Sequence, residues 1–382
     1  MRTLTVRSIV NARKNLYTGG YRIYTSIDLS MQDGLQQSVN DTLSGYTGVN
    51  DEGVYELQAS AVCIDNDNGY VRAIVGGRSQ EFPGYTLNRA YQSFRQPGSA
   101  IKPLTVYTPS FEQNYTPDTI VVDEPIEDGP RNANGTYLGE ITIRTAVEKT
   151  PSIRSRGSCM TSSHRIRDCL ILKAMNFSRI SPSDYRLATA LGGFTNGVSA
   201  LEMASGFAAI ENDGYYRTPT CIVKIEDGNG TVLYDSGQKP VLIYKKNAAR
   251  MMTDVLKGVI TNGTGKGLDL GDMPCAGKTG TTNDQKDGWF VGYTRYYTTS
   301  VWVGYDMPKK LQGLMGNTYP GKIWQSFMNK AHEGLEPLEF LPYARISDDL
   351  LQQQESGNGQ PEENPAEETP EEETPEEEMP VG

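Results

Sequence analysis

The chain has 382 residues, enough for about two to three domains, and its 36 Lys and Arg against 47 Asp and Glu give a net charge of −11. This charge is local: residues 355–382 hold 11 Glu and no Lys or Arg, so residues 1–354 carry 36 acidic and 36 basic residues. A neutral body disfavours a general nucleic-acid binder, which needs a basic excess to neutralise phosphates.

The first part of the chain predicts a strand, a helix and a hairpin. Residues 21–25 are β-branched and aromatic, as in a strand. Apolar residues then recur on one helical face at Met31, Leu35, Val39 and Leu43, which predicts a helix. Asp28 precedes this helix and can cap its N-terminus. Two alternating apolar runs, residues 59–64 and 70–75, flank an Asn-Gly pair, which favours a hairpin.

The rest of the chain alternates helices with paired strands. A helix is expected to begin at Ser99, with Pro103 in its first turn. Further helices are predicted at residues 187–212 and 248–259, and strands at 216–234 (paired around a Gly-rich turn), 288–293 and 300–305. Strand pairs early and late, with helices between them, predict an α+β layer in which the two ends of the chain share a sheet.

The segment from residue 361 onward is a near-repeat of Pro, Glu and Thr. It has no apolar periodicity and a high density of like charge, so the sequence predicts disorder. An interaction tail is the functional alternative.

Five Cys and two His are present, with no C-x-x-C pair. An odd number of Cys in a chain of this length does not indicate a disulfide framework. Cys159, His164 and Cys169 are evenly spaced, but the spacing matches no common zinc site and a fourth ligand is missing. We therefore predict no metal and no cofactor.

Ser99 and Lys102 form an S-x-x-K pair at the start of a predicted helix. Residues three apart share a helix face, so the Lys amine can reach the Ser hydroxyl. The electropositive helix N-terminus disfavours a second cation, which helps lower the pKa of the Lys so that it can accept the Ser proton. Ser236 and Lys239 repeat the spacing within a Gly- and Pro-containing turn, where we predict a solvated loop.

The segment from Lys278 to Thr282 reads K-T-G-T-T and precedes a predicted strand. A Lys, hydroxyls and an approachable Gly backbone suit the recognition of a carboxylate, and Gly280 leaves room for a ligand along a strand edge. An exposed polar edge strand explains the same residues equally well, so this segment alone does not decide between them.

Together these segments resemble one family. S-x-x-K with K-T-G is typical of penicillin-binding proteins and serine β-lactamases. The flanking residues 95–99, 190–193, 197–204 and 288–293 are similar to the transpeptidase domain of class A penicillin-binding proteins, in the family's order and over residues 18–335. The resemblance implies a serine β-lactamase-like α+β fold: an antiparallel sheet flanked by helices, with a helical subdomain. It divides the chain into a linker and strand–helix lead-in (1–50), the transpeptidase domain (51–340) and an acidic tail (341–382).

The resemblance implies a D,D-transpeptidase that crosslinks peptidoglycan stem peptides ending in D-Ala-D-Ala and binds β-lactams. Ser99 would attack the penultimate D-Ala carbonyl, with Lys102 as its base and Lys278 as a further catalytic residue. The N–H groups of Ser99 and Thr281 would form the oxyanion hole. The terminal carboxylate would be held by Lys278, Thr279 and Thr281, with Gly280 between them.

A third family motif, S-x-N, is expected directly after Lys149, but the sequence there reads Thr150-Pro151-Ser152. Thr150 or Ser152 could partly replace a hydroxyl at this degenerate position, yet no Asn follows at the required spacing. Residues 150–172 fit nothing in the family, and their four Arg, two Cys and five Ser show no helical face.

One hypothesis is that residues 150–172 are translated in a shifted reading frame. Under the genetic code, codons can be chosen for this segment whose bases, read from the third base onward, spell SLNTVAWKLYDELTPDPGLSYL. That peptide supplies Ser-Leu-Asn directly after Lys149. The alternative is a divergent segment that leaves the site impaired.

The sequence contains no apolar run of about 18 residues and no signal-peptide core, so neither a membrane span nor a signal peptide is predicted. Class A relatives carry an N-terminal anchor and a glycosyltransferase domain, which implies an N-terminally truncated chain from a membrane-anchored parent acting on the extracytoplasmic face. Two rival functions remain open: a hydrolase of the D,D-carboxypeptidase or β-lactamase type, and a degenerate module that binds wall peptides or β-lactams without turnover.

Overall fold

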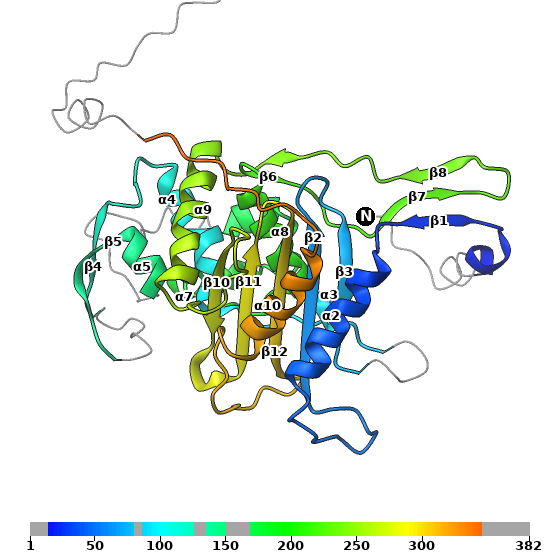
Figure 1. Cartoon of the computed structure of the whole chain (residues 1–382), viewed down its shortest axis with the longest axis horizontal. Coiled ribbons are helices and arrows are strands. Elements are labelled where there is room, and N and C mark those ends of the chain that lie inside the picture. The colour runs from blue at the N-terminus through cyan, green and yellow to red at the C-terminus, as the bar shows by residue number, and fades with distance from the viewer. Residues whose placement is uncertain (1–13, 80–85, 126–134, 150–168, 346–382) are drawn as a thin grey trace, which may run out of the picture. The chain divides into compact units, whose positions relative to one another are not determined.

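The computed structural model describes residues 14–79, 86–125, 135–149 and 169–345. Within the unit formed by residues 1–343, the central feature is a five-stranded antiparallel sheet in the order β10-β11-β12-β2-β3 (Figure 1). Its strands are β10 (Ala276–Thr281), β11 (Asp287–Tyr293), β12 (Tyr297–Tyr305), β2 (Leu57–Asp65) and β3 (Val71–Val75). β12 pairs with β2, so early and late segments share one sheet, as predicted.

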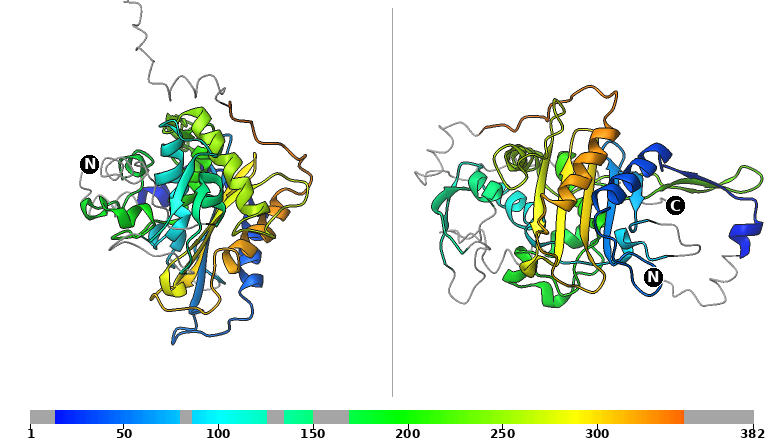
Figure 2. Two further views of the ribbon diagram at one scale, coloured as in Figure 1. Left: turned by 90° about the vertical axis from the view of Figure 1, so that its left-hand side faces the viewer. Right: turned by 60° about the horizontal axis from the view of Figure 1, so that its bottom comes forward.

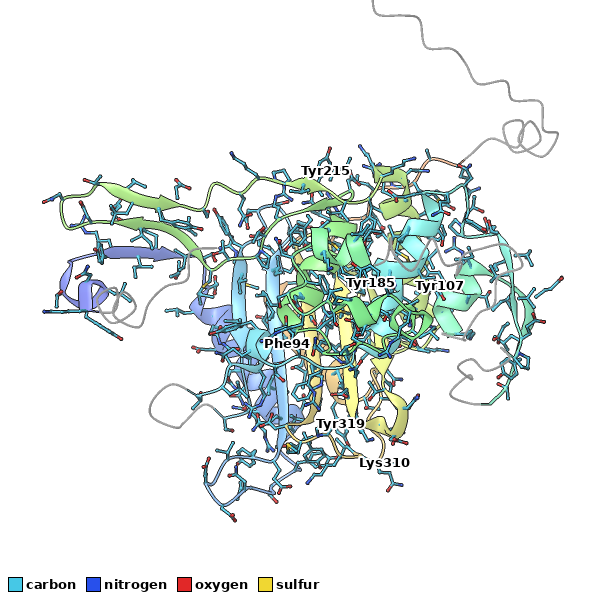
Figure 3. The ribbon with its side chains drawn as sticks, turned by 180° about the vertical axis from the view of Figure 1, so that it is seen from behind. Phe94, Tyr107, Tyr185, Tyr215, Lys310 and Tyr319 are labelled. Carbon is cyan, nitrogen blue, oxygen red and sulfur yellow. The ribbon has the colours of Figure 1, made fainter. Side chains whose placement is uncertain are left out.

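Helices cover both faces of this sheet. α2 (Leu29–Thr42) and α10 (Tyr319–Ala331) pack against each other on one face, whereas α8 (Ala200–Glu211) packs on the other (Figures 1 and 3). α9 (Lys246–Thr261) packs beside β10. The alternation of buried side chains along β2 follows this arrangement, because Ala61 and Cys63 join the core under α2 and α10, while Val62 and Ile64 join the core under α8.

The predicted early elements are confirmed. β1 (Arg22–Thr25) precedes α2, whose N-cap Asp28 accepts a hydrogen bond from the N–H of Met31 at 2.9 Å. Leu35, Val39 and Leu43 of the predicted apolar face are fully buried. β2 and β3 form the predicted hairpin, and α9, β11 and β12 correspond to the predicted later elements.

The single helix predicted at residues 187–212 is wrong. The structure has α7 (Leu187–Ala190) and α8, separated by a loop in which Gly192 and Gly197 adopt φ of 90° and 84°. These values favour glycine, so the loop breaks the Ala- and Leu-rich pattern that predicted one helix. Ser199 is the N-cap of α8 and forms a capping box with Glu202.

The helix predicted from Ser99 is also different in detail. It consists of a 3₁₀ turn η1 (Gly98–Ile101), a π turn η2 (Pro103–Tyr107) and a short α-helical segment α4 (Thr108–Phe111). Within η2 the N–H of Thr108 donates to the carbonyl of Pro103, a separation of five residues.

Smaller sheets lie outside the central one. β1, β7 (Ile222–Glu226) and β8 (Val232–Asp235) form an antiparallel sheet that extends away from the five-stranded sheet (Figure 2). β7 and β8 are the strands predicted around the Gly-rich turn, whereas Tyr216 lies in a separate pair. Further elements are β4 (Ile120–Asp123), β5 (Gly139–Thr142), β6 (Tyr215–Tyr216), β9 (Val241–Leu242), α3 (Arg89–Gln92), α5 (Ile143–Lys149), η3 (Pro182–Asp184) and η4 (Asn283–Gln285).

No helix within the described ranges is long and apolar enough to cross a bilayer.

Candidate active site

The Ser99 turn packs directly against the edge strand β10. Gly98 has φ of 53°, and a Cβ atom there would lie 2.8 Å from the carbonyl oxygen of Thr281. On the strand, a Cβ atom at Gly280 would lie 2.4 Å from the carbonyl oxygen of Pro97. The backbone of the Ser99 turn therefore contacts the backbone of β10 with no side chain between them. The S-x-x-K and K-T-G motifs thus lie next to each other.

A buried ion pair anchors the segment that leads into this turn. The Nε of Arg95 lies 2.8 Å from an Asp287 carboxylate oxygen, with both side chains less than one tenth exposed. The other two guanidinium nitrogens of Arg95 donate to the carbonyls of Tyr305 and Asp306, and the guanidinium lies 4.9 Å from the Trp302 ring centroid. The start of the motif is thus tied to the ends of β11 and β12.

Gln96 ties the same segment to two more elements. Its carbonyl accepts a hydrogen bond from the Trp289 indole N–H at 2.9 Å. Its side-chain amide exchanges two 2.7 Å bonds with the backbone of Phe194. Gly192 lies so close to Gly98 that a Cβ atom there would be 2.2 Å from the Gly98 carbonyl oxygen. The Gly-rich loop that interrupts the predicted helix therefore supports the Ser99 turn.

Two lysines are buried at this junction. Lys102 is 3% exposed and Lys278 is fully buried. Burial lowers the pKa of Lys102 to about 8, partly opposed by the negative charge of Asp123. Burial lowers the pKa of Lys278 well below its ordinary value, and the positive charge of Lys102 lowers it further. An amine in this environment has a neutral form that can accept a proton near physiological pH.

The hydroxyls of the K-T-G-T segment both have protein partners. The Oγ1 of Thr279 lies 2.6 Å from the Oγ1 of Thr264, which follows α9. The Oγ1 of Thr281 accepts a hydrogen bond from the Gly316 N–H at 3.1 Å. Neither Thr264 nor Gly316 was predicted from the sequence, although the two glycines that flank Thr264 mark a position where chain segments approach closely.

The degenerate S-x-N residues Thr150 and Ser152 lie outside the described residues, as do Cys159 and His164. The segment before them, which ends at Lys149, is described. The Thr264 N–H donates to the carbonyl of Glu148 at 3.1 Å, and Lys149 Nζ donates to the carbonyl of Asn262. The last described residues before the gap therefore lie beside the residue that contacts Thr279.

The structure tests two further sequence predictions. Residues 169–174 are helical, with Cys169 and Leu172 buried, so the expectation of no helical face is wrong for the end of segment 150–172. Lys239 of the second S-x-x-K is exposed in a loop, as predicted. In the described part of the chain, no cluster of three or more His, Cys, Asp or Glu side chains could hold a metal.

The model of the penicillin binding protein transpeptidase domain matches residues 59–153 and 177–332. The chain belongs to this family. Its sheet and helices are those of the serine β-lactamase-like fold that was predicted. The match is interrupted at residues 154–176, a stretch that overlaps residues 150–172, where the sequence departs from the family pattern.

Curated relatives match most of the chain. Penicillin-binding protein 1A of Clostridium acetobutylicum is 34% identical over 84% of this chain and 41% of its own length. Penicillin-binding protein 4 of Bacillus subtilis is 33% identical over 83% of this chain and 50% of its own length. The chain thus spans about half the length of the curated relatives it matches.

Solved structures confirm the fold. PonA1 of Mycobacterium tuberculosis in complex with penicillin V has a TM-score of 0.73 at 24% identity, covering 90% of this chain and 95% of that one. Penicillin-Binding Protein 1A of Haemophilus influenzae has a TM-score of 0.70 at 19% identity, covering 88% and 71%.

Proposed function

We propose that this chain is a serine D,D-transpeptidase domain in which Ser99 is the nucleophile and Lys102 its general base. The observation that carries the proposal is the burial of Lys102 three residues after Ser99, with a pKa lowered to about 8. A substantial neutral fraction then exists near pH 7–8, where the amine can accept the Ser99 proton as the hydroxyl attacks. Lys278 is fully buried beside Lys102, whose charge further lowers the pKa of Lys278, and would act as a hydrogen-bond donor to the substrate carboxylate.

The substrate would be a stem peptide ending in D-Ala-D-Ala, bound along the edge of β10. The backbone N–H groups of Ser99 and Thr281 would hold the carbonyl oxygen as it becomes an oxyanion. The direct contact between Gly98 and β10 supports this, because it brings the two donor segments together without intervening side chains. Lys278, Thr279 and Thr281 would bind the terminal carboxylate.

The reaction would have two steps. Ser99 Oγ forms an ester with the penultimate D-Ala as the peptide bond to the last D-Ala breaks, and the departing amine takes the proton that Lys102 received. An amine of a second stem peptide then attacks the ester and gives up one proton through Lys102, so that the crosslinking amide forms as the Ser99 hydroxyl is regenerated. A β-lactam would follow the first step and remain on Ser99, consistent with the family and with the penicillin V complex of PonA1. Such chemistry would act on the extracytoplasmic face, and the longer relatives favour a membrane-anchored parent for this domain.

Labelling with a fluorescent penicillin tests the nucleophile. The full chain is expected to form a covalent adduct that Ser99→Ala abolishes. Ser236→Ala, which removes the hydroxyl of the second S-x-x-K in its loop, is the matched control and should label normally. Absence of label on folded unmodified protein contradicts the catalytic proposal, and label that persists in Ser99→Ala contradicts the assignment of the nucleophile.

A second candidate function is binding of wall peptides or β-lactams without turnover. The departure from the family pattern at residues 150–172 favours it, because the S-x-N motif expected directly after Lys149 is missing there. We further propose that this departure reflects a shifted reading frame across residues 150–172. The DNA of the gene decides this point: codons that cannot yield Ser-Leu-Asn after Lys149 would exclude it. Turnover of a thioester substrate analogue separates a transpeptidase from a binding module.

A further inference from the structure

The loop after α9 is built so that Thr264 occupies one fixed position. A Cβ atom at Gly263 would lie 2.7 Å from the carbonyl oxygen of Glu148 and 2.8 Å from the Cα of Val259. The N–H of Gly265 donates to the carbonyl of Val259 at 2.9 Å, and that of Thr264 donates to the carbonyl of Glu148. These contacts hold the loop against the end of α9 and the end of α5, so the Thr264 side chain has little freedom to move.

From this position the Thr264 hydroxyl reaches the middle residue of the K-T-G segment. The two Oγ1 atoms of Thr264 and Thr279 are 2.6 Å apart, and Thr279 is only 7% exposed. Gly316 fixes the strand from another direction, because a Cβ atom there would lie 2.8 Å from the Cβ of Thr279. Thr279 is thus held by neighbours that are remote from the Ser99 motif in sequence.

A hydroxyl donates one proton and accepts up to two hydrogen bonds. If Thr264 donates to Thr279, the single proton of Thr279 remains for another acceptor. The same arrangement occurs two residues later, where Thr281 accepts the Gly316 N–H and retains its own proton for donation. Both hydroxyls are then donors on the strand segment that carries Lys278, whose Nζ donates to the carbonyl of Thr279 at 3.2 Å. Two hydroxyl donors on this segment match the two oxygens of a carboxylate.

We propose that Thr264 is a positioning residue for recognition of the substrate carboxylate: it donates a hydrogen bond to Thr279 and so directs the Thr279 proton toward the ligand. The inference deepens the proposed function and rests on it, since it concerns the carboxylate subsite of the same active site. Thr264 itself does not touch the ligand. Its effect is therefore specific to ligands that carry a free carboxylate.

The decisive comparison uses the full chain and paired ligands. Thr264→Val removes the hydroxyl and keeps the branched shape, whereas Thr264→Ser keeps the hydroxyl. The matched control is Thr261→Val, which removes an exposed hydroxyl that bonds to the carbonyl of Lys257 on the same helix. Acylation rates are measured with benzylpenicillin and with its methyl ester, which lacks the anionic carboxylate.

Thr264→Val is expected to slow acylation by benzylpenicillin about tenfold, since one hydrogen bond to a charged group is weakened. The ester rate should change less than about twofold, and Thr264→Ser should recover the benzylpenicillin rate. Equal losses with both ligands would assign Thr264 a general structural role and overturn the inference, as would an unchanged benzylpenicillin rate. If Thr264→Val does not fold, as judged by thermal melting, Thr264→Ala takes its place in the same comparison.

A binding measurement keeps this test separate from the catalytic proposal. In the Ser99→Ala background, calorimetry compares an acetylated D-Ala-D-Ala peptide with its C-terminal amide. A preference for the acid that Thr264→Val removes supports the inference, even if the unmodified chain is never acylated and the transpeptidase proposal fails. If the unmodified chain is not acylated and neither peptide binds, both proposals are wrong.

Discussion

Replacement of Arg95 by Met tests whether the buried anchor of the Ser99 segment stabilises the domain. The variant removes the guanidinium that pairs with Asp287 and that donates to the carbonyls of Tyr305 and Asp306. The Asp287 carboxylate then stays buried, with the Trp302 indole N–H still donating to it at 3.0 Å. Removing one partner of a buried ion pair costs about 3–5 kcal/mol, because the remaining charge is uncompensated.

The expected change in melting temperature follows from the size of the unit. An unfolding entropy of about 2.1 cal/mol/K per residue gives about 0.7 kcal/mol/K for Met1–Tyr343, so the melting temperature should fall by about 4–7 °C. Arg144→Met is the matched control, since its pair with Asp254 has side chains 31% and 40% exposed and contributes at most about 1 kcal/mol. Scanning calorimetry compares both variants with the double variant Arg95→Met/Asp287→Asn, which should recover part of the loss. Equal shifts for Arg95→Met and Arg144→Met would refute the argument from burial.

Three other changes probe the site and the core. The rate of acylation by penicillin should rise with pH and level off above about pH 8, because Lys102 accepts a proton only when neutral and burial lowers its pKa to about 8. An acylation rate that is flat between about pH 6 and 9 would contradict this role of Lys102. Gly280→Ala should slow acylation at least about tenfold, since the new Cβ atom would lie 2.4 Å from the Pro97 carbonyl oxygen. The control Gly45→Ala should leave the acylation rate unchanged, because a Cβ atom there has no neighbouring atom within 4 Å. Trp324→Ala, at a fully buried position, should lower the free energy of unfolding by about 3–5 kcal/mol in urea titrations, and a loss below about 1 kcal/mol would argue against its place in the core.

Local pattern was sufficient for the elements whose periodicity matches their burial. The four-residue repeat from Met31 to Leu43 predicted α2, and the Asn-Gly turn predicted the β2–β3 hairpin. Pattern failed at residues 187–212, because Ala and Leu favour a helix while Gly192 and Gly197 are required by contacts with a distant segment. A helix propensity is a local quantity, so it cannot register a contact with residues about one hundred positions earlier in the chain.

The same difference between local pattern and long-range contact separates the site residues that were predicted from those that were missed. Ser99, Lys102 and Lys278 were predicted because their residue types and spacing carry chemical meaning. Thr264 and Gly316 were missed, since their contacts with β10 depend on the path of the whole chain. The sequence predicts a lowered pKa for Lys102 from its place near a helix N-terminus, whereas desolvation by burial is the dominant cause in the folded protein.

Restoration of the middle motif is the sharpest test of how the chain departs from its family. The family match resumes at residue 177, and Glu148 is held beside Thr264, so the supports on both sides of the unmatched segment are present. Replacement of residues 150–172 by SLNTVAWKLYDELTPDPGLSYL would then supply a Ser and an Asn at a prepared position. If that Ser relays protons, acylation by penicillin should become about 100-fold faster or more, the usual contribution of positioned proton transfer. A control with the new Ser and Asn changed to Ala should lose this gain. An equal rate in the present and restored chains would mean that the written segment performs the same task, and the shifted-frame hypothesis would lose its functional basis.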